Sequence, residues 1–192
     1  MGGLSRRSTA IKQKKMENSN ILIVDSGNFS SPRTKLKADE LAQFRLKSQL
    51  MMETFVLDGV QALGLGEKDF SLGTEWLLTE VKRHNLPIVA SNLDCEGATL
   101  PKVQSVVASG VQFNFYSLLS ENAKIEGCTV TSPTEAWQNV KGEANGDINV
   151  LFSHLGKTEL IGDLLDFDIV METALGKRID SPEALDGDTV ML

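Results

Sequence analysis

The sequence predicts an α/β fold, in which a mostly parallel β-sheet is flanked by helices and includes one hairpin. Apolar, β-favouring segments alternate along the chain with segments of helical periodicity, which is the pattern of βαβ units. The clearest segment is Ile21–Asp25, whose four apolar residues run into the turn Ser26–Asn28. Such a run is typical of a strand buried on both faces. The 192 residues show no repeat and no interdomain linker, so we expect a single domain over residues 1–192.

The composition and the charge limit the range of functions. Hydrophobic residues make up 41% of the chain and charged residues 23%, as in an ordinary globular protein. The net charge of −7 disfavours nucleic acid or an anionic membrane as a partner. No apolar run approaches the roughly 20 residues of a transmembrane helix. Residues 1–15 are basic but lack the apolar core of a secretory signal, so we expect either a cytosolic protein or a chain without its true beginning.

Helical periodicity and capping signals mark the predicted helices. Leu4 and Ile11 lie seven residues apart in Gly2–Asn18, which we interpret as a weakly amphipathic surface helix laid on a sheet. Ser132-Pro133-Thr134-Glu135 is a capping box with proline at the first helical position, so a helix should start there and reach about Val140. The other helices are expected at Leu36–Phe55, with Leu41, Phe44, Met51 and Phe55 on its buried side, at Gly73–Asn85 and at Thr158–Leu165.

The remaining strands are predicted from short β-rich runs. Val103–Ala108 and Val111–Leu118 are joined by Ser109-Gly110, and this dipeptide predicts a hairpin. Residues 172–192 are expected to be a polar tail with little periodicity. Further apolar segments that run into turn residues lie at Asp58–Leu65, Pro87–Ser91, Ile148–Phe152 and Asp168–Met171.

Polar side chains suited to catalysis or metal binding follow several of these segments. In open α/β sheets, functional residues gather at the carboxyl ends of the strands. We therefore expect a site built from these loop residues. Its candidate members are Asp25 and Asn28, Glu67 and Asp69, Asn92, and His154.

The order of these motifs is similar to that in the metallophosphoesterase domain of the 5′-nucleotidase and UDP-sugar hydrolase family. Residues 2–7, Gly-Gly-Leu-Ser-Arg-Arg, resemble the Gly-Gly-Leu-Ala-Arg-Arg helix of that family. Ile21–Asn28 resembles its Leu-Leu-Asp-Ala-Gly-Asp strand and turn. Residues 62–70 resemble its Ala-Leu-Gly segment with Gly-Asn-His-Glu-Phe, and residues 87–93 resemble Pro-Val-Leu-Ser-Ala-Asn-Leu. The resemblance ends with Ser-His-Leu-Gly at 153–156 and with 168–176, where the family has Asp-Val-Ile-Ile-Gly-Gly-His-Thr-His.

This resemblance covers nearly the whole chain and implies a fold, a cofactor and a location. The implied fold is a calcineurin-like sandwich of β-sheet layers with flanking helices. The implied cofactor is a pair of divalent metals, Mn²⁺, Zn²⁺ or Mg²⁺, which activates water and binds a phosphate. The family is usually periplasmic or extracellular, which implies membership of a larger exported assembly.

Several ligand positions of the family are altered in this chain. The first ligands of the family, Asp-x-His, precede the Gly-Gly helix, where this chain has no residues. The bridging aspartate falls on Asn28, and the Asn-His pair falls on Glu67 and Lys68. Lys68 would bring an ammonium group to the place of the catalytic imidazole, which is unfavourable beside two metals. The remaining positions are Ala174 and Gly176, in place of the final His-x-His, and His154, which stays in register.

Three functional hypotheses follow from these alterations. The first is a domain that has lost its dinuclear metal site and acts as a non-catalytic binding or scaffold module, without a cofactor. The second is a hydrolase of nucleotides or other phosphoesters. The third is a fragment whose missing first strand carries part of the activity. The second hypothesis needs a rebuilt metal site around Asp25, Asn28, Asp69 and His154, with Glu67 as a further ligand and Asn92 binding the substrate.

Each candidate residue also has a simpler structural interpretation. His154 is then a strand-end histidine satisfied by backbone hydrogen bonds, and residues 67–69 are solvated loop charges. The arginine pair at 6–7 is expected to be part of a solvated face rather than a phosphate site. Cys95 and Cys128 lack a metal-ligand spacing, so two buried free thiols are favoured, and a disulfide is expected only if the protein is exported.

The Ile21–Asp25 strand predicts self-association. In the family, the strand that carries Asp-x-His lies beside it, so its absence would leave a row of unpaired backbone groups. A two-fold dimer would satisfy two such edges at once, and we favour this homodimer. The alternatives are coverage by the Gly2–Asn18 helix or by the tail, in which Thr189–Leu192 is apolar enough to add a short strand.

Overall fold

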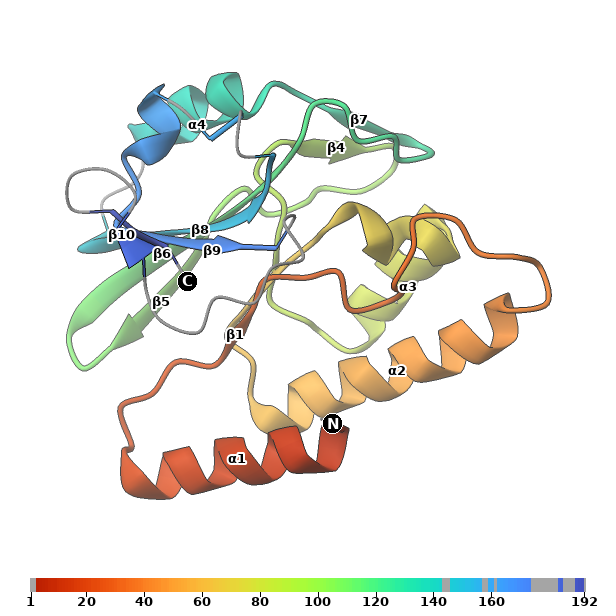
Figure 1. Cartoon of the computed structure of the whole chain (residues 1–192), viewed down its shortest axis with the longest axis horizontal. Coiled ribbons are helices and arrows are strands. Elements are labelled where there is room, and N and C mark those ends of the chain that lie inside the picture. The colour runs from red at the N-terminus through yellow and green to blue at the C-terminus, as the bar shows by residue number, and fades with distance from the viewer. Residues whose placement is uncertain are drawn as a thin grey trace.

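The computed structural model describes residues 3–142, 146–156, 159–160, 162–173, 183–184 and 189–191. Strands occupy the middle of the molecule and helices lie outside them (Figure 1). None of the helices in these ranges is both long and apolar enough to cross a membrane. The helices are α1 Leu4–Glu17, α2 Leu41–Asp58, α3 Thr74–Arg83, α4 Pro133–Lys141 and the 3₁₀ helices η1 Glu67–Leu72 and η2 Gly162–Leu165. The strands are β1 Val24–Asp25, β2 Ala62–Gly64, β3 Ile88–Val89, β4 Leu93–Cys95, β5 Gln104–Ala108, β6 Val111–Leu119, β7 Cys128–Val130, β8 Ile148–His154, β9 Ile169–Glu172, β10 Glu183–Ala184 and β11 Val190–Met191.

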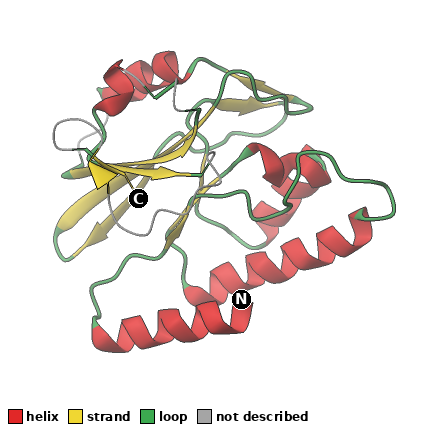
Figure 2. Cartoon of the chain, viewed as in Figure 1, coloured by secondary structure: helices red, strands yellow, loops and turns green. Residues whose placement is uncertain are grey.

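The strands form two main sheets and one separate pair (Figure 2). The smaller sheet has the order β1-β2-β3 and is parallel throughout. The larger sheet has the order β10-β11-β9-β8-β6-β5, and its four central strands are parallel, with β5 and β10 antiparallel at the edges. β4 and β7 pair antiparallel by themselves. The predicted α/β class with a mostly parallel sheet is therefore confirmed.

Three apolar layers hold the sheets and helices together. Between the two sheets, the rings of Phe115 and Phe152 stack with centroids 5.5 Å apart. On the side of α1, α2 and α3, the core includes Met52, Phe55 and Leu77. On the side of α4, it contains Tyr116, Trp137 and Phe167, with the last two rings 4.3 Å apart. These aromatic contacts fix the sandwich of two sheets between two helical layers.

Two elements in the N-terminal part differ from the sequence prediction. β1 contains only Val24–Asp25 and is half-buried, because no described strand pairs with its outer side. The expectation of a strand buried on both faces is wrong. α2 begins at Leu41 instead of residue 36, because the Glu40 carboxylate accepts a hydrogen bond from the Lys37 amide at 2.9 Å and pairs with Arg33. These contacts hold the preceding residues in a turn.

Elements with strong local signals match the sequence. In the β5–β6 hairpin, Ala108 pairs with Val111, and Ser109 and Gly110 have φ of 53° and 82°. Positive φ at both central residues is what a type I′ turn requires. α1, α3 and α4 lie close to their predicted bounds, and Pro133 occupies the first turn of α4, although no side-chain hydrogen bond caps that helix. The helix predicted at 158–165 is a 3₁₀ turn over the residues that the structure describes there.

The tail contributes two strands to the larger sheet. Val190 of β11 pairs in parallel with Ile169 of β9, and β10 pairs with β11. The expectation of a polar tail with little periodicity did not indicate these strands. The short strand expected within Thr189–Leu192 is present as β11, but it pairs with β9 instead of β1. The open side of β1 faces α1, and residues 21–24 line a groove of about 490 Å³ with Arg7, Ala10, Ile11 and Lys14.

A disulfide joins β4 to β7. Cys95 and Cys128 lie opposite each other in the register of this pair, with their Cα atoms 4.0 Å apart. The favoured interpretation as two free thiols is therefore wrong. The register of two short strands brings the cysteines together, and their separation of 33 residues gave no signal of it.

Candidate functional site

The turns that follow β1 and β2 meet the end of β8. Gly66 lies at this junction, where a Cβ atom would be 2.3 Å from Asn28 Oδ1 and 2.7 Å from His154 Cε1. Asn28 adopts a left-handed backbone with φ of 59°, a conformation that asparagine tolerates. The close approach brings three predicted site residues, Asn28, Asp69 and His154, into one cluster.

Asp69 organises the loops of this cluster. Its carboxylate accepts hydrogen bonds from the backbone amides of Asn28 at 2.7 Å, Ser30 at 3.0 Å and Gly66 at 2.9 Å. The side chain is fully buried. Burial raises the pKa of Asp69 to about 6, while the three amides oppose this rise. Asp69 thus ties the β1 turn to the start of η1.

His154 is held neutral by its surroundings. Its Nε2 lies 2.7 Å from the carbonyl oxygen of Ser26, so Nε2 carries the proton and donates it. Nδ1 is then an acceptor, with Thr173 Oγ1 at 2.7 Å and Asn28 Nδ2 at 3.3 Å. Burial lowers the pKa of His154 to about 4, and the charge of Lys68 acts in the same direction. Both ring nitrogens are therefore engaged.

Asn28 and Lys68 complete the cluster. The Asn28 side chain accepts a hydrogen bond from the Lys68 amide at 3.1 Å through Oδ1, while its Nδ2 faces the imidazole. The carbonyl and amino groups of Asn28 are both used within the protein. The ammonium of Lys68 adds positive charge near His154, at the position where the resemblance implies a catalytic histidine.

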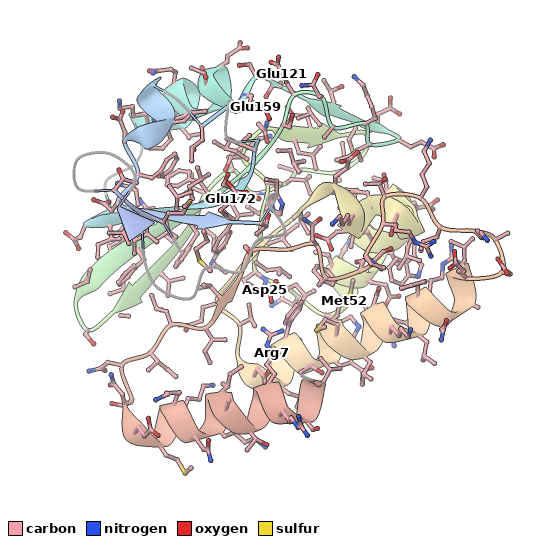
Figure 3. The ribbon with its side chains drawn as sticks, in the orientation of Figure 1. Arg7, Asp25, Met52, Glu121, Glu159 and Glu172 are labelled. Atoms are coloured by element: carbon pink, nitrogen blue, oxygen red, sulfur yellow. A yellow bond between two sulfur atoms is a disulfide. The ribbon has the colours of Figure 1, made fainter. Side chains whose placement is uncertain are left out.

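The other predicted acids point elsewhere. Asp25 accepts a hydrogen bond from the Gly27 amide at 3.0 Å and pairs with Arg7 at 3.3 Å. Figure 3 shows Arg7 on α1, on the side of the helix that faces Asp25. Burial raises the pKa of Asp25, and Arg7 opposes this rise. Glu67 lies 3.4 Å from the Lys124 amide and does not join the cluster.

Asn92 connects three segments of the chain through hydrogen bonds from its side chain to the backbone. Its Nδ2 donates to the carbonyl oxygens of Leu119 at 2.7 Å and Thr131 at 2.9 Å, and its Oδ1 accepts from the Leu119 amide at 2.9 Å. The residue is 1% exposed. Both amide hydrogens of Asn92 are therefore committed to the backbone.

Among the described residues, the donor set does not fit a dinuclear metal centre. Across the part of the chain that the structure describes, no three His, Cys, Asp or Glu side chains are grouped to hold a metal ion. Asp69 is directed at three amides, Asp25 at Arg7, and the imidazole of His154 at protein groups on both sides. Residues 174 and 176, where the last family ligands would fall, lie outside the described residues.

Two partners in the site were not predicted from the sequence. Thr173 follows β9 and contacts His154, and Arg7 crosses from α1 to Asp25. The parallel register of β8 and β9, in which Ser153 pairs with Glu172, puts Thr173 beside His154. A sequence pattern could have located Thr173 only if that register had been known.

The sequence is related to curated 5′-nucleotidases. No protein-family model matches the chain. It is 26% identical over 131 residues to a 5′-nucleotidase of Rattus norvegicus, and 25% identical over 167 residues to a snake venom 5′-nucleotidase of Gloydius brevicauda. These matches cover 66% and 84% of the chain but only 20% and 26% of the relatives. The chain thus spans a fifth to a quarter of their length.

Solved structures show the same fold. The sulfate thiohydrolase SoxB of Thermus thermophilus has a TM-score of 0.80 at 16% identity, over all of this chain and 38% of that one. The calcineurin-like phosphoesterase YfkN of Bacillus subtilis has a TM-score of 0.74 at 16% identity, over 98% of this chain and 72% of that one. The calcineurin-like sandwich that the motifs imply is therefore confirmed.

Proposed function

We propose that the chain is a metallophosphoesterase domain of the 5′-nucleotidase type that has lost its dinuclear metal site and acts as a non-catalytic binding or scaffold module. The self-contained hydrogen bonding around His154 supports this proposal. The imidazole donates from Nε2 to the Ser26 carbonyl oxygen, and its Nδ1 lies 2.7 Å from Thr173 Oγ1 and 3.3 Å from Asn28 Nδ2, so a metal would have to break these contacts. The Lys68 cation nearby adds an electrostatic cost for a divalent ion.

Metal content and hydrolysis test this proposal together. The purified chain would be incubated with Mn²⁺ or Zn²⁺, dialysed, and assayed for bound metal by mass spectrometry and for hydrolysis of AMP and bis(p-nitrophenyl) phosphate. We expect neither stoichiometric metal nor turnover. The matched variant Asn28→Asp/Lys68→His, which restores two family positions, should hold more metal than the wild-type chain.

Two other results would contradict the proposed loss of the metal site. Two tightly held metal ions per chain together with turnover would overturn the proposal. Metal that is retained by the wild-type chain and lost in His154→Ala would support the rebuilt hydrolase site, in which Asp25, Asn28 and Asp69 are the other ligands. In that case Glu67 and Asn92 would be the next residues to replace.

The disulfide supports a location in an oxidising compartment, because such bonds are rare in the cytosol. We infer that the domain belongs to an exported protein and serves there as one module of a larger assembly. A thiol-reactive maleimide tests this inference. It is added to intact cells and then to denatured samples, with and without prior reduction. Cys95 and Cys128 should react only after reduction. Labelling of both cysteines without reduction would contradict an exported location.

A further inference from the structure

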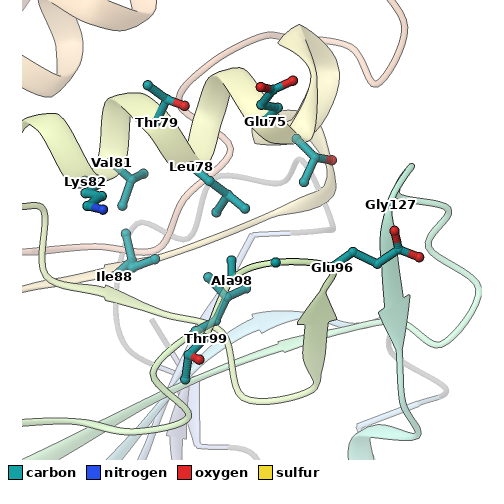
Figure 4. Close-up of a pocket in the computed structure, with 13 residues that line it drawn as sticks. Glu75, Leu78, Thr79, Val81, Lys82, Ile88, Glu96, Ala98, Thr99 and Gly127 are labelled. Carbon is teal, nitrogen blue, oxygen red and sulfur yellow. The ribbon is translucent and has the colours of Figure 1, made fainter.

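A groove that shares no residue with the candidate site runs between α3 and the loop that follows β4 (Figure 4). Its volume is about 760 Å³. The buried side chains of Val81, Ile88 and Leu100 are at its base, and Leu78 and Ala98 are partly exposed above them. A concave apolar surface with a polar rim is the usual form of a binding site.

The rim carries opposite charges at its two ends. Figure 4 shows Glu75 and Glu96 toward one end of the groove and Lys82 toward the other. All three side chains are exposed. Among the described residues, no ion pair involves any of them. The groove therefore offers an acidic end, an apolar middle and a basic end to a ligand.

The wall of the groove opposite α3 includes two glycines. Gly97 and Gly127 line it, and a Cβ atom added at either glycine would meet nothing within 4 Å. Both glycines are exposed. An incoming peptide backbone could thus approach the wall closely at these two positions.

The dimensions match a short extended peptide. Glu75 and Lys82 are seven residues apart on α3, which corresponds to about 10 Å along a helix. An extended chain covers that distance in about three residue steps, at roughly 3.3 Å each.

We propose that this groove binds an extended peptide segment of about four residues, with a basic side chain at the Glu75/Glu96 end, apolar side chains in the middle and an acidic group at the Lys82 end. The occupant is recognised by charge at both ends and by contact with the apolar base. In the wall of the groove opposite α3, residues 96 and 127 are next to Cys95 and Cys128 in the sequence. The Cys95–Cys128 disulfide therefore holds that wall in place.

The test uses NMR titration of the oxidised full chain with the peptide Lys-Val-Leu-Glu, acetylated and amidated at its ends. We expect saturable shifts of amides in α3 and in residues 96–100. Glu75→Gln/Glu96→Gln should weaken the apparent affinity about fivefold, because two exposed charge contacts are lost. The matched control Glu53→Gln/Glu135→Gln removes the same net charge from exposed positions on α2 and α4 and should leave the affinity unchanged.

Further variants make each outcome decisive. Thr79→Trp puts a large side chain at an exposed rim position and should block binding without changing the melting temperature. Shifts outside the groove, equal weakening by both charge variants, or no saturable shifts at millimolar peptide would overturn the proposal. Shifts of the same amides on simple dilution would assign the groove to a second copy of the chain, and would overturn the proposal as well.

Discussion

Replacement of His154 by glutamine should reverse the response of this part of the protein to acid. His154 and Asp69 are 8% and 0% exposed, and burial moves their pKa values in opposite directions, to about 4 and about 6. Between pH 7.5 and 5, the His154 side chain becomes protonated in the unfolded protein but stays largely neutral in the folded protein, so acid favours unfolding. Over the same pH range, Asp69 becomes protonated in the folded protein but stays largely ionised in the unfolded protein, so its titration favours folding in acid.

The two effects can be estimated from the ordinary and shifted pKa values. Between pH 7.5 and 5, His154 should cost about 2 kcal/mol of unfolding free energy, and Asp69 should contribute about 1 kcal/mol. The two effects therefore largely offset each other in the wild-type protein. Glutamine can keep one donor and one acceptor in place of the imidazole but does not titrate. The variant should keep only the Asp69 contribution.

Urea denaturation of the oxidised protein at pH 7.5 and pH 5 measures this difference, with the fluorescence of Trp76 and Trp137 as the signal. All other titrating groups are common to the two proteins, so the difference between their pH responses isolates His154. Lys12→Ala, at an exposed position of α1, is the control and should behave as the wild type. If the wild type and His154→Gln change by the same amount to within about 0.5 kcal/mol, the imidazole is not buried in its neutral form.

Three further predictions concern packing, the disulfide and assembly. Gly66→Ala should destabilise the fold by about 1–3 kcal/mol, because its Cβ would overlap the cluster, whereas Gly142→Ala, whose Cβ meets nothing within 4 Å, should be nearly neutral in the same urea assay. Reduction should lower the unfolding free energy by about 3–4 kcal/mol, and a Cys95→Ser/Cys128→Ser variant should show no response to reductant. Sedimentation equilibrium should show a dimer that Leu22→Lys shifts to monomer; a wild-type monomer at high concentration would refute pairing through the open side of β1.

Local sequence signals were sufficient for much of the fold. The Ser109-Gly110 turn, the proline at the start of α4 and the apolar periodicity of α3 act within a few residues, so their elements formed as predicted. β1 and the strands of the tail depend on partners distant in the sequence. Ile21 and its neighbours look like a central strand, yet they lie at the edge of the smaller sheet because strand order is a tertiary property.

The candidate site divides in the same way. The gathering of Asn28, Asp69 and His154 followed from the rule that loops at the carboxyl ends of strands meet. Their chemistry did not follow, because it depends on which groups the side chains contact. No local pattern indicated that Asp69 would bind three amides, or that Arg7 of α1 would pair with Asp25 of β1.

The order of the strands along the chain has a consequence for how the protein is made. The described strands of the smaller sheet come from residues 24–89, and those of the larger sheet come from residues 104–191. A ribosome therefore releases the described strands of the smaller sheet before the first described strand of the larger sheet emerges. Domains that assemble in this way can begin folding during synthesis. The face that carries Ala62 and Val89 is exposed until Phe115 and Phe152 arrive, which makes the interval between the two layers the period when the nascent chain is most exposed to aggregation.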